Sequence, residues 1–231
     1  MKRCVEFVMG VVLLLAVFVL SGPAAGVLWN GSAAVSGGTS PVVALDAGHG
    51  GADPGKIGIN EVLEKDINLA ISLKTKEFLE KEGVQVVLTR TDDGGLYKET
   101  DGNKKRADLS RRCEIIEENQ VDFVVSIHQN SYGDGDVCGS QMFYYKSSEK
   151  GKKLAEILQK VFNESVSSRE LKAKENGEYY MLLHVSCPIV IAECGFLSNW
   201  EDAEKLRTES YQEEVAKALT KGILQYIDEE F

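Results

Sequence analysis

Two histidines and one glutamate stand where strands of an α/β protein would end. His49, His128 and Glu193 each follow or close an apolar run, the three runs being PVVALD, VDFVVSIH and PIVIAE. In open α/β sheets, ligands bind outside the carboxyl ends of parallel strands. The sequence therefore predicts that three segments far apart in the chain deliver two imidazoles and a carboxylate to one edge of a sheet.

A further carboxylate is expected at the same edge. Glu64 begins the helical pattern after the first strand, and Glu61 competes with it for any role. Two histidines and a carboxylate with an open fourth position form a catalytic zinc site, which lowers the pKa of bound water to about 7. Another carboxylate can take the proton of that water and pass it to a leaving group. Residue types and spacing thus indicate metal-assisted hydrolysis, without deciding which carboxylate binds the metal.

Each of these residues also has a plainer explanation. His49 can be a residue of a glycine-rich turn, His128 a buried histidine with its hydrogen bonds satisfied, and Glu64 a first-turn acid that suits the helix dipole. Glu193 is harder to explain in this way, because burying a carboxylate unpaired costs several kcal/mol. Asp46, three residues before His49, is a candidate to orient an imidazole from behind.

Strand and helix patterns alternate along the chain. Short apolar runs predict strands at 41–46, 84–90, 121–128, 139–145 and 188–193. Apolar residues at helical spacing predict helices at 63–81, 106–119, 149–166 and 209–229, and the polar stretch 91–105 is expected to be a long loop. The alternation predicts an α/β fold, a single domain with a central mostly parallel sheet covered by helices on both faces and with the zinc site at the C-terminal strand edge.

Length and charge narrow the class of protein. The chain has 231 residues, enough for one domain with a full core, and its formal net charge is −10. Nucleic acid is not expected as a partner, because binding to phosphates needs a basic face. Order is expected to begin at Pro41, so residues 41–231 are predicted to form the folded domain.

The first 40 residues have the composition of a targeting segment and a tether. Lys2 and Arg3 precede an apolar run from Phe7 to Leu20, and small residues follow it. This pattern predicts a signal peptide or N-terminal membrane anchor over residues 1–26, which engages the membrane or the export machinery. Residues 27–40, rich in Gly, Ser and Ala, are expected to be a linker. The folded domain is therefore expected to act outside the cytoplasm, exported or membrane-anchored.

The five cysteines do not indicate a disulfide framework. Their number is odd and no CxxC pair occurs among Cys4, Cys113, Cys138, Cys187 and Cys194. They are expected to be small buried hydrophobic residues.

Four motifs together resemble a known family. The segments LDAGHGGADPG, LEKDINLA, SIHQNS and AECGFLSN are similar to the signatures of the zinc-dependent N-acetylmuramoyl-L-alanine amidases, in the family's order and spacing over about residues 41–228. The resemblance implies an α/β domain with a mostly parallel sheet. It also implies an enzyme that hydrolyses the amide between N-acetylmuramic acid and L-alanine in peptidoglycan, so that residues 41–231 would be an amidase catalytic domain.

The same resemblance implies a role for each motif residue. Zn²⁺ would be the cofactor, with His49 of GHGG, Glu64 of LEKD and His128 of SIHQN as its ligands. Glu193 of AECGF would be the general acid/base, which settles the choice among the carboxylates. Arg112 stands where the family usually has an arginine in the helix before the third strand, and it is expected to be structural.

Two further stretches, GLYKETDGNKKRADLSRR and YYMLLHVSCP, look like the sporulation- and germination-specific branch of the family. In that branch the amidase strips stem peptides from cortex muramic acid, and muramic-δ-lactam is then formed. The likeness implies spore-cortex peptidoglycan as substrate and a location facing the cell wall, in the forespore intermembrane space or cortex. An accessory protein is a conceivable partner.

Some features depart from the family pattern or leave alternatives open. Leu183 stands where many members have a basic residue near the substrate, so the contacts to the stem peptide are open. His184 is expected to be structural or to line the substrate site, and not to bind metal.

Two alternative functions stay open, a zinc carboxypeptidase acting on stem peptides and a non-catalytic peptidoglycan-binding protein. A phosphate-binding loop at GHGG is disfavoured, because neither a Walker-type Lys-Ser/Thr nor GxGxxG occurs.

Overall fold

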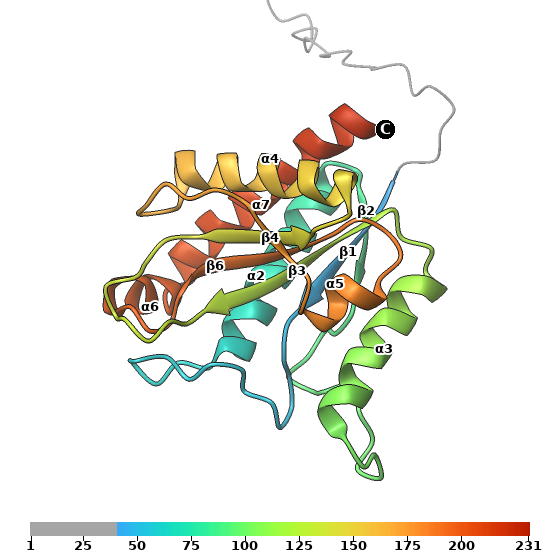
Figure 1. Ribbon diagram of the computed structural model, residues 1–231, viewed down its shortest axis with the longest axis horizontal. Helices are drawn as coiled ribbons and strands as arrows, with labels where there is room; N and C mark the ends of the chain where they lie inside the picture. The colour runs from blue at the N-terminus through green and yellow to red at the C-terminus, as the bar shows by residue number, and fades with distance from the viewer. Residues whose placement is uncertain (1–40) are drawn as a thin grey trace, which may run out of the picture. The chain divides into compact units, whose positions relative to one another are not determined.

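Residues 41–231, the part of the chain that the computed structural model describes, contain one six-stranded sheet (Figure 1). Its order is β2-β1-β3-β6-β4-β5. The strands are β1 (Val42–Ala47), β2 (Gln85–Leu88), β3 (Phe123–Asn130), β4 (Gln141–Tyr145), β5 (Lys174–Asn176) and β6 (Ile189–Phe196). Strands β2, β1, β3 and β6 run parallel, and β4 is antiparallel to β6. The prediction of a mostly parallel sheet is therefore confirmed.

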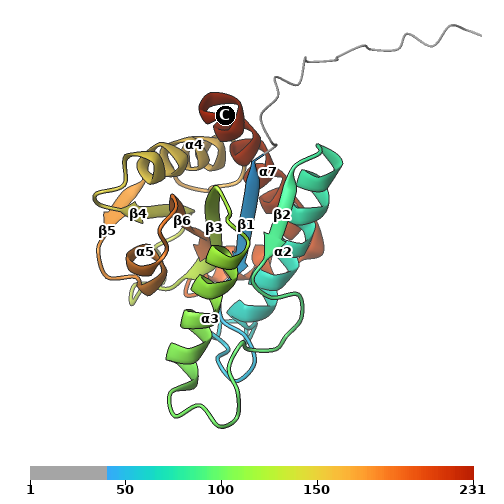
Figure 2. The ribbon, with the colours of Figure 1, turned by 90° about the vertical axis from the view of Figure 1, so that its right-hand side faces the viewer.

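Helices cover both faces of this sheet (Figure 2). They are α2 (Glu64–Lys81), α3 (Lys104–Glu118), α4 (Glu149–Ser165), α5 (Tyr180–His184), α6 (Trp200–Leu206) and α7 (Glu209–Glu230). Side chains of α2, α4, α6 and α7 share the larger hydrophobic core, and side chains of α3 and α5 share a smaller core on the opposite face. The expectation of helices on both faces is confirmed.

The two cores divide the strand residues alternately, as the period of a β-strand requires. Val125 and Val190 belong to the larger core, whereas Val124 and Ile191 belong to the smaller one. Counting in twos along β3 and β6 places His128 and Glu193 on the face of the smaller core. These two residues are also direct partners in the register of β3 with β6, so they are neighbours on one face of the sheet.

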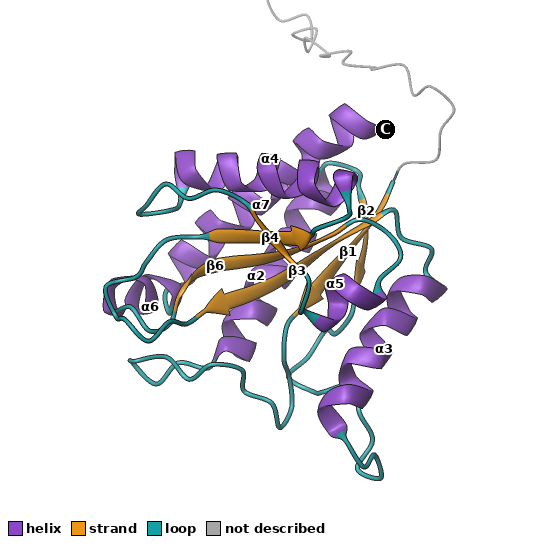
Figure 3. Cartoon of the chain, viewed as in Figure 1, coloured by secondary structure: helices purple, strands orange, loops and turns teal. Residues whose placement is uncertain are grey.

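The chain order of the strands creates a crevice at the carboxyl ends of β1 and β3. From β1 the chain passes to β2 on one side of it and then to β3 on the other side. Ligands of open α/β sheets bind at such a switch point, because the connections diverge there. Two long connections without helix or strand, residues 48–63 and 89–103, follow β1 and β2 at this end (Figure 3).

Three short elements were not expected from the sequence, namely β5, α5 and α6. Each has three to seven residues, too few for an apolar period to show. Strands β3 and β6 also continue past their expected ends, to Asn130 and Phe196. His128 and Glu193 therefore lie within strands near their carboxyl ends and not just beyond them.

Other sequence expectations concern the termini and the cysteines. The targeting segment at 1–26 and the linker at 27–40 lie outside the described residues, as does Cys4. Among the described cysteines, all free, Cys194 is buried as expected, whereas Cys113, Cys138 and Cys187 are only partly buried. Within residues 41–231, no helix combines the length and the apolar character needed to cross a membrane.

Candidate active site

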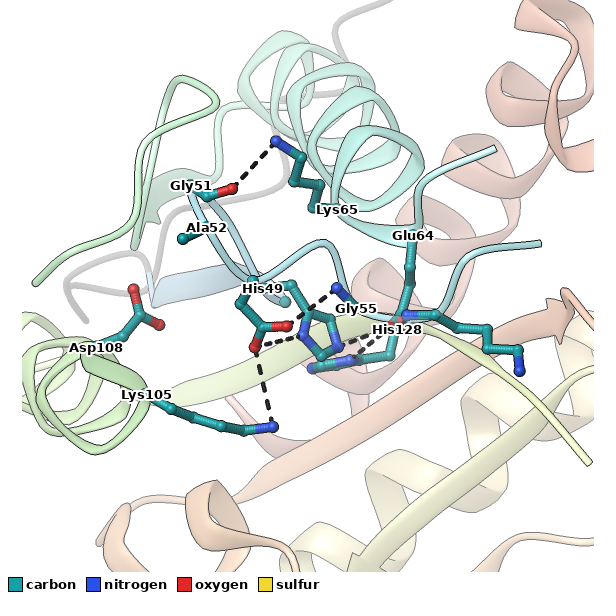
Figure 4. Close-up of polar contacts among 12 residues, drawn as sticks. His49, Gly51, Ala52, Gly55, Glu64, Lys65, Lys105, Asp108 and His128 are labelled. Atoms are coloured by element: carbon teal, nitrogen blue, oxygen red, sulfur yellow. Dashed lines mark hydrogen bonds and ion pairs between the residues drawn. The ribbon is translucent and has the colours of Figure 1, made fainter. Parts of the chain in front are cut away.

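His49, Glu64 and His128 converge at the crevice between β1 and β3 (Figure 4). Glu64 Oε1 lies 3.0 Å from His128 Nδ1 and 3.2 Å from His49 Nε2. One donor atom from each residue lies within 4.8 Å of the others, which is a group that could hold a metal ion. Two imidazoles and one carboxylate are the donor types that zinc takes in catalytic sites, where three protein ligands leave a position open.

Glycines allow the loop after β1 to pass close to these side chains. A Cβ atom on Gly48 would lie 2.2 Å from His128 Cε1, and one on Gly55 would lie 2.5 Å from Glu64 Oε2. A larger residue at either position would push a ring or a carboxylate out of place. The glycines of the first motif are thus required by close packing against the donor residues.

The start of α2 is fitted to the same loop, and this fit positions Glu64. The backbone N–H of Glu64 donates to the Lys56 carbonyl, and the Lys56 N–H donates to Glu64 Oε2 at 2.7 Å. The Gln129 N–H donates to Oε1 at 3.1 Å. Although burial acts to raise the pKa of Glu64, its hydrogen bonds with both histidines hold that pKa well below its ordinary value. Glu64 is therefore an ionised carboxylate fixed at both oxygens.

Two hydrogen-bonding contacts hold His49 in an uncommon backbone conformation. Its backbone is in the left-handed region, with φ of 62°, which is uncommon for a residue with a side chain. Arg112 Nη2 donates to its carbonyl at 2.5 Å, and the Asp53 carboxylate contacts its Nδ1 at 3.0 Å. A histidine that binds metal commonly donates its other ring N–H to a carboxylate, which fixes the tautomer and the ring orientation. Asp53 is placed for that role, with Nε2 left to face Glu64.

Asp46 does not have the role that its position before His49 suggested. Its carboxylate accepts hydrogen bonds from Thr89 at 2.6 Å, Ser126 at 2.5 Å and Arg112 at 2.7 Å, and it bonds to no imidazole of residues 41–231. Its partners lie directly after β2, on β3 and on α3, and not on the loop that carries His49. The prediction for Asp46 was wrong in this respect, and Asp53 is the carboxylate that contacts His49.

Glu193 lies beside the cluster on β6, buried to 6% exposure. Its Oε2 has no hydrogen-bond partner among the described residues. Burial raises the pKa of Glu193 to about 7, although the nearby His128 acts to lower it. Tyr179 faces this carboxylate, and burial raises the pKa of that phenol to about 12. A carboxyl group with a pKa near neutrality can both accept and return a proton at physiological pH.

A cavity of about 290 Å³ opens from the cluster toward α3 and α5. His49 and His128 line it on the side of the cluster, and Leu109, Tyr180 and Met181 contribute to its other walls. It is the space next to the donor cluster that a substrate can fill.

Two other residues singled out from the sequence lie away from the donor cluster. Glu61 is exposed in the loop before α2, so the structure favours Glu64 as the carboxylate near the histidines. His184 ends α5, where its ring stacks on Tyr180 at 3.8 Å and Nδ1 contacts the Tyr180 carbonyl. It is exposed and does not line the cavity, which is consistent with a structural role.

Sequence reasoning missed three residues that the fold brings to this place: Asp53, Tyr179 and Lys105. Asp53 lies within the first motif, so a carboxylate four residues after the histidine was an available signal. Tyr179 and Lys105 carried no local signal, because they reach the cavity through the packing of α5 and α3 against the sheet. Arg112, in contrast, has the structural role expected of it, buried between Asp46 and Asp108.

An α/β sheet with two histidines and a glutamate that could hold a metal ion at its carboxyl edge is an arrangement suited to a metal-dependent hydrolase. The chain belongs to the N-acetylmuramoyl-L-alanine amidase family, whose pattern matches residues 43–225. Enzymes of this family act on peptidoglycan and are generally zinc-dependent. The family resemblance drawn from the four motifs is thereby confirmed.

Individual relatives agree with this assignment. The chain is 34% identical over 191 residues to the germination-specific N-acetylmuramoyl-L-alanine amidase of Bacillus subtilis, covering 81% of this chain and 80% of the relative. It is 29% identical to the sporulation-specific amidase of the same bacterium, covering 78% and 66%. The solved structure of the CwlD amidase from Clostridioides difficile in complex with the GerS lipoprotein superposes with a TM-score of 0.80 at 38% identity, covering 83% of this chain and 100% of that one.

Proposed function

We propose that this chain is a zinc-dependent amidase that removes stem peptides from spore-cortex peptidoglycan. The bond cleaved is the amide between the lactyl group of N-acetylmuramic acid and L-alanine. The observation that carries the proposal is the convergence of His49, Glu64 and His128 beside the buried carboxylate of Glu193, in a chain of the amidase family.

The donor residues suit zinc in number, type and support. Glu64 approaches one nitrogen of each histidine, and the second ring nitrogen of His49 contacts Asp53. When bound, zinc supplies a Lewis acid that polarises a carbonyl oxygen and makes water more acidic. His49, Glu64 and His128 would hold it.

Glu193 would carry the proton between the two halves of the reaction. Its carboxylate accepts a proton from the attacking water as the oxygen bonds to the lactyl carbonyl carbon. The same group then gives that proton to the alanine nitrogen as the C–N bond breaks, and the products are a lactyl carboxylic acid and the free α-amine of the peptide, which exchange the remaining proton in water. The unpartnered Oε2 and the pKa near 7 support this role, because the group can exist in both protonation states.

The finer assignment to the spore cortex is supported by the relatives named as germination- and sporulation-specific amidases. Action on the cortex requires the catalytic domain to lie outside the cytoplasm, and the N-terminal segment would provide export or anchoring. A solved relative is in complex with a lipoprotein, which supports an accessory lipoprotein as partner of this chain as well.

The test is the identity of the bond that is cleaved. The full chain, loaded with zinc, is incubated with cortex peptidoglycan, and the products are identified by mass spectrometry. A matched sample is treated with a chelator and then resupplied with zinc. Free stem peptides that begin at L-alanine, absent with chelator and restored with zinc, are expected.

Two outcomes would overturn the proposal. Loss of terminal amino acids from otherwise intact muropeptides would identify a carboxypeptidase. Binding to peptidoglycan without any change in its muropeptides would identify a non-catalytic binding protein.

A further inference from the structure

The cavity beside the donor cluster continues along α3. Lys105, Leu109 and Tyr180 line the cavity and also line a second depression, which Asn103 and Arg106 complete. The two hollows therefore form one groove that runs from the histidines to the start of α3. Its walls are largely apolar, so the charged groups within it decide what it can recognise.

Among the described residues, two cationic side chains line the cavity beside the donor cluster, those of Arg112 and Lys105. Arg112 is buried, and its guanidinium is occupied by Asp108, Asp46 and two backbone carbonyls. Its donors are thus satisfied within the protein. Lys105 differs, because its side chain is 71% exposed and its acidic neighbour among the described residues is Asp53, with Nζ 3.9 Å from Oδ2.

The Asp53 carboxylate directs Lys105 toward the site without neutralising it fully. Asp53 already bonds to His49 at 3.0 Å and accepts from the Gly55 N–H at 3.1 Å. A contact of 3.9 Å is too long for a hydrogen bond, so the lysine donors remain available. Figure 4 shows Lys105 extending from α3 toward the group around His49.

The neighbouring lysine at the same helix end is committed elsewhere. Lys104 donates to Glu99 at 2.7 Å and lies over the ring of Tyr97. On the other wall, residues 178–181 include no Lys or Arg, and Glu178 there is an acid. Leu183 of α5 is exposed and lies outside the residues that line the groove. The free positive charge of the inner groove therefore comes from α3 and not from α5.

We propose that Lys105 binds a carboxylate of the stem peptide, on the peptide side of the bond to be cleaved. This inference rests on the proposed amidase function. The choice of the peptide over the glycan follows from charge. The acetylated sugars of the glycan are neutral, whereas the residue after L-alanine is a glutamate whose α-carboxyl is free or amidated.

The experiment uses two muramyl tripeptides that differ only at that α-carboxyl, one with a carboxylate and one with a carboxamide. The kcat and KM for release of the tripeptide are measured with the zinc-loaded full chain, with Lys105→Gln and with Lys104→Gln. The wild type is expected to favour the carboxylate by about tenfold in kcat/KM, mainly through KM, since a charge-assisted hydrogen bond at a partly exposed site has about this effect. Lys105→Gln should reduce the preference to about twofold or less, and Lys104→Gln should keep it.

The outcomes separate this inference from the function on which it rests. No release of peptide from either substrate by the wild type would contradict the amidase function itself. Cleavage of both substrates at equal efficiency, or an unchanged preference in Lys105→Gln, would leave the amidase function intact and overturn the role of Lys105. Zinc content is measured in each variant, because loss of metal would lower activity on both substrates equally and leave the ratio unaffected.

Discussion

Two buried carboxylates on the same side of the sheet, Asp46 on β1 and Glu193 on β6, have opposite properties. Asp46 is 1% exposed and Glu193 is 6% exposed. Burial by itself raises the pKa of both. Arg112 and two hydroxyl donors outweigh it at Asp46 and lower that pKa to about 2, whereas burial dominates at Glu193 and raises its pKa to about 7.

The difference lies in the partners and not in the depth of burial. Asp46 is surrounded by groups that stabilise its charge, so it stays ionised and ties β1 to β3 and α3. Glu193 has an oxygen without a hydrogen-bond partner among the described residues, so the desolvation of its charge is not compensated and its pKa rises. A satisfied buried charge stabilises the fold, and an unsatisfied one marks the place of chemistry.

The largest expected effect is on turnover. Glu193→Gln should lower kcat by about 10⁴-fold, because the same group serves as base and as acid. Zinc content and melting temperature should remain those of the wild type, since glutamine keeps the shape and adds no buried charge. The rate of stem-peptide release, with zinc measured by elemental analysis, checks both expectations.

The matched control for this variant is Glu61→Gln, which removes an exposed acid of the nearby loop. It should keep the wild-type rate. Full activity in Glu193→Gln would end its assignment as the acid/base and would also remove the contrast with Asp46.

The next effect is on stability. Asp46→Asn should lower the free energy of unfolding at pH 7 by about 3 kcal/mol, because it leaves the buried Arg112 with one fewer counter-charge. The pKa of Asp46 is depressed from its ordinary 3.8 to about 2 in the folded protein. Its contribution to stability is therefore present above pH 4 and is lost as the pH falls toward 2. Between pH 4 and pH 2, the free energy of unfolding measured with urea should therefore fall by about 2 kcal/mol less in Asp46→Asn than in the wild type.

Comparison with Thr89→Val separates charge from hydrogen bonding at this site. That variant removes one neutral hydrogen-bond donor to Asp46. It should lower the free energy of unfolding by about 1 kcal/mol and leave the dependence of that free energy on pH below 4 unchanged. If both variants lost the same free energy of unfolding and showed the same dependence on pH, the charge of Asp46 would not contribute to stability.

The smallest effect is expected at Asp53, whose carboxylate is partly exposed, unlike the buried carboxylates of Asp46 and Glu193. Asp53→Asn should weaken zinc binding by about tenfold, since the carboxylate that orients His49 becomes a neutral amide. Competition with a chromogenic chelator measures this affinity. Asp93→Asn, which removes the partner of Lys65 on a neighbouring loop, should leave zinc affinity unaltered. Equal affinities in the wild type and Asp53→Asn would show that His49 needs no orienting acid.

Local patterns were enough to predict most of the fold. The apolar runs of β1, β3 and β6 and the helical spacing of α2, α4 and α7 depend on side chains a few residues apart, so they can be recognised in the sequence. The short elements α5 and α6 could not, because their conformation depends on packing against distant segments. Consequently the wall of the cavity that holds Tyr179 was not foreseen.

The residues of the candidate site that follow from strand ends and motifs were predictable from the sequence. Their hydrogen-bond partners were not. His49 and His128 were placed at one edge because parallel strands end together. The pairing of Asp46 was misjudged, because closeness in sequence suggested His49, whereas the strand turns the side chain toward Ser126, 80 residues away.

By itself, the sequence determined the α/β class, the family and the residue types available for metal-assisted hydrolysis, since these follow from local periodicity and from four ordered motifs. Only the tertiary structure decided which groups satisfy one another. Glu64 meets His128 across 64 residues and Arg112 meets Asp46 across 66, and such contacts determine whether a buried carboxylate is neutralised or left reactive. Charge, burial and hydrogen bonding act over a few ångströms in space, and the chain order does not reveal which groups come that close.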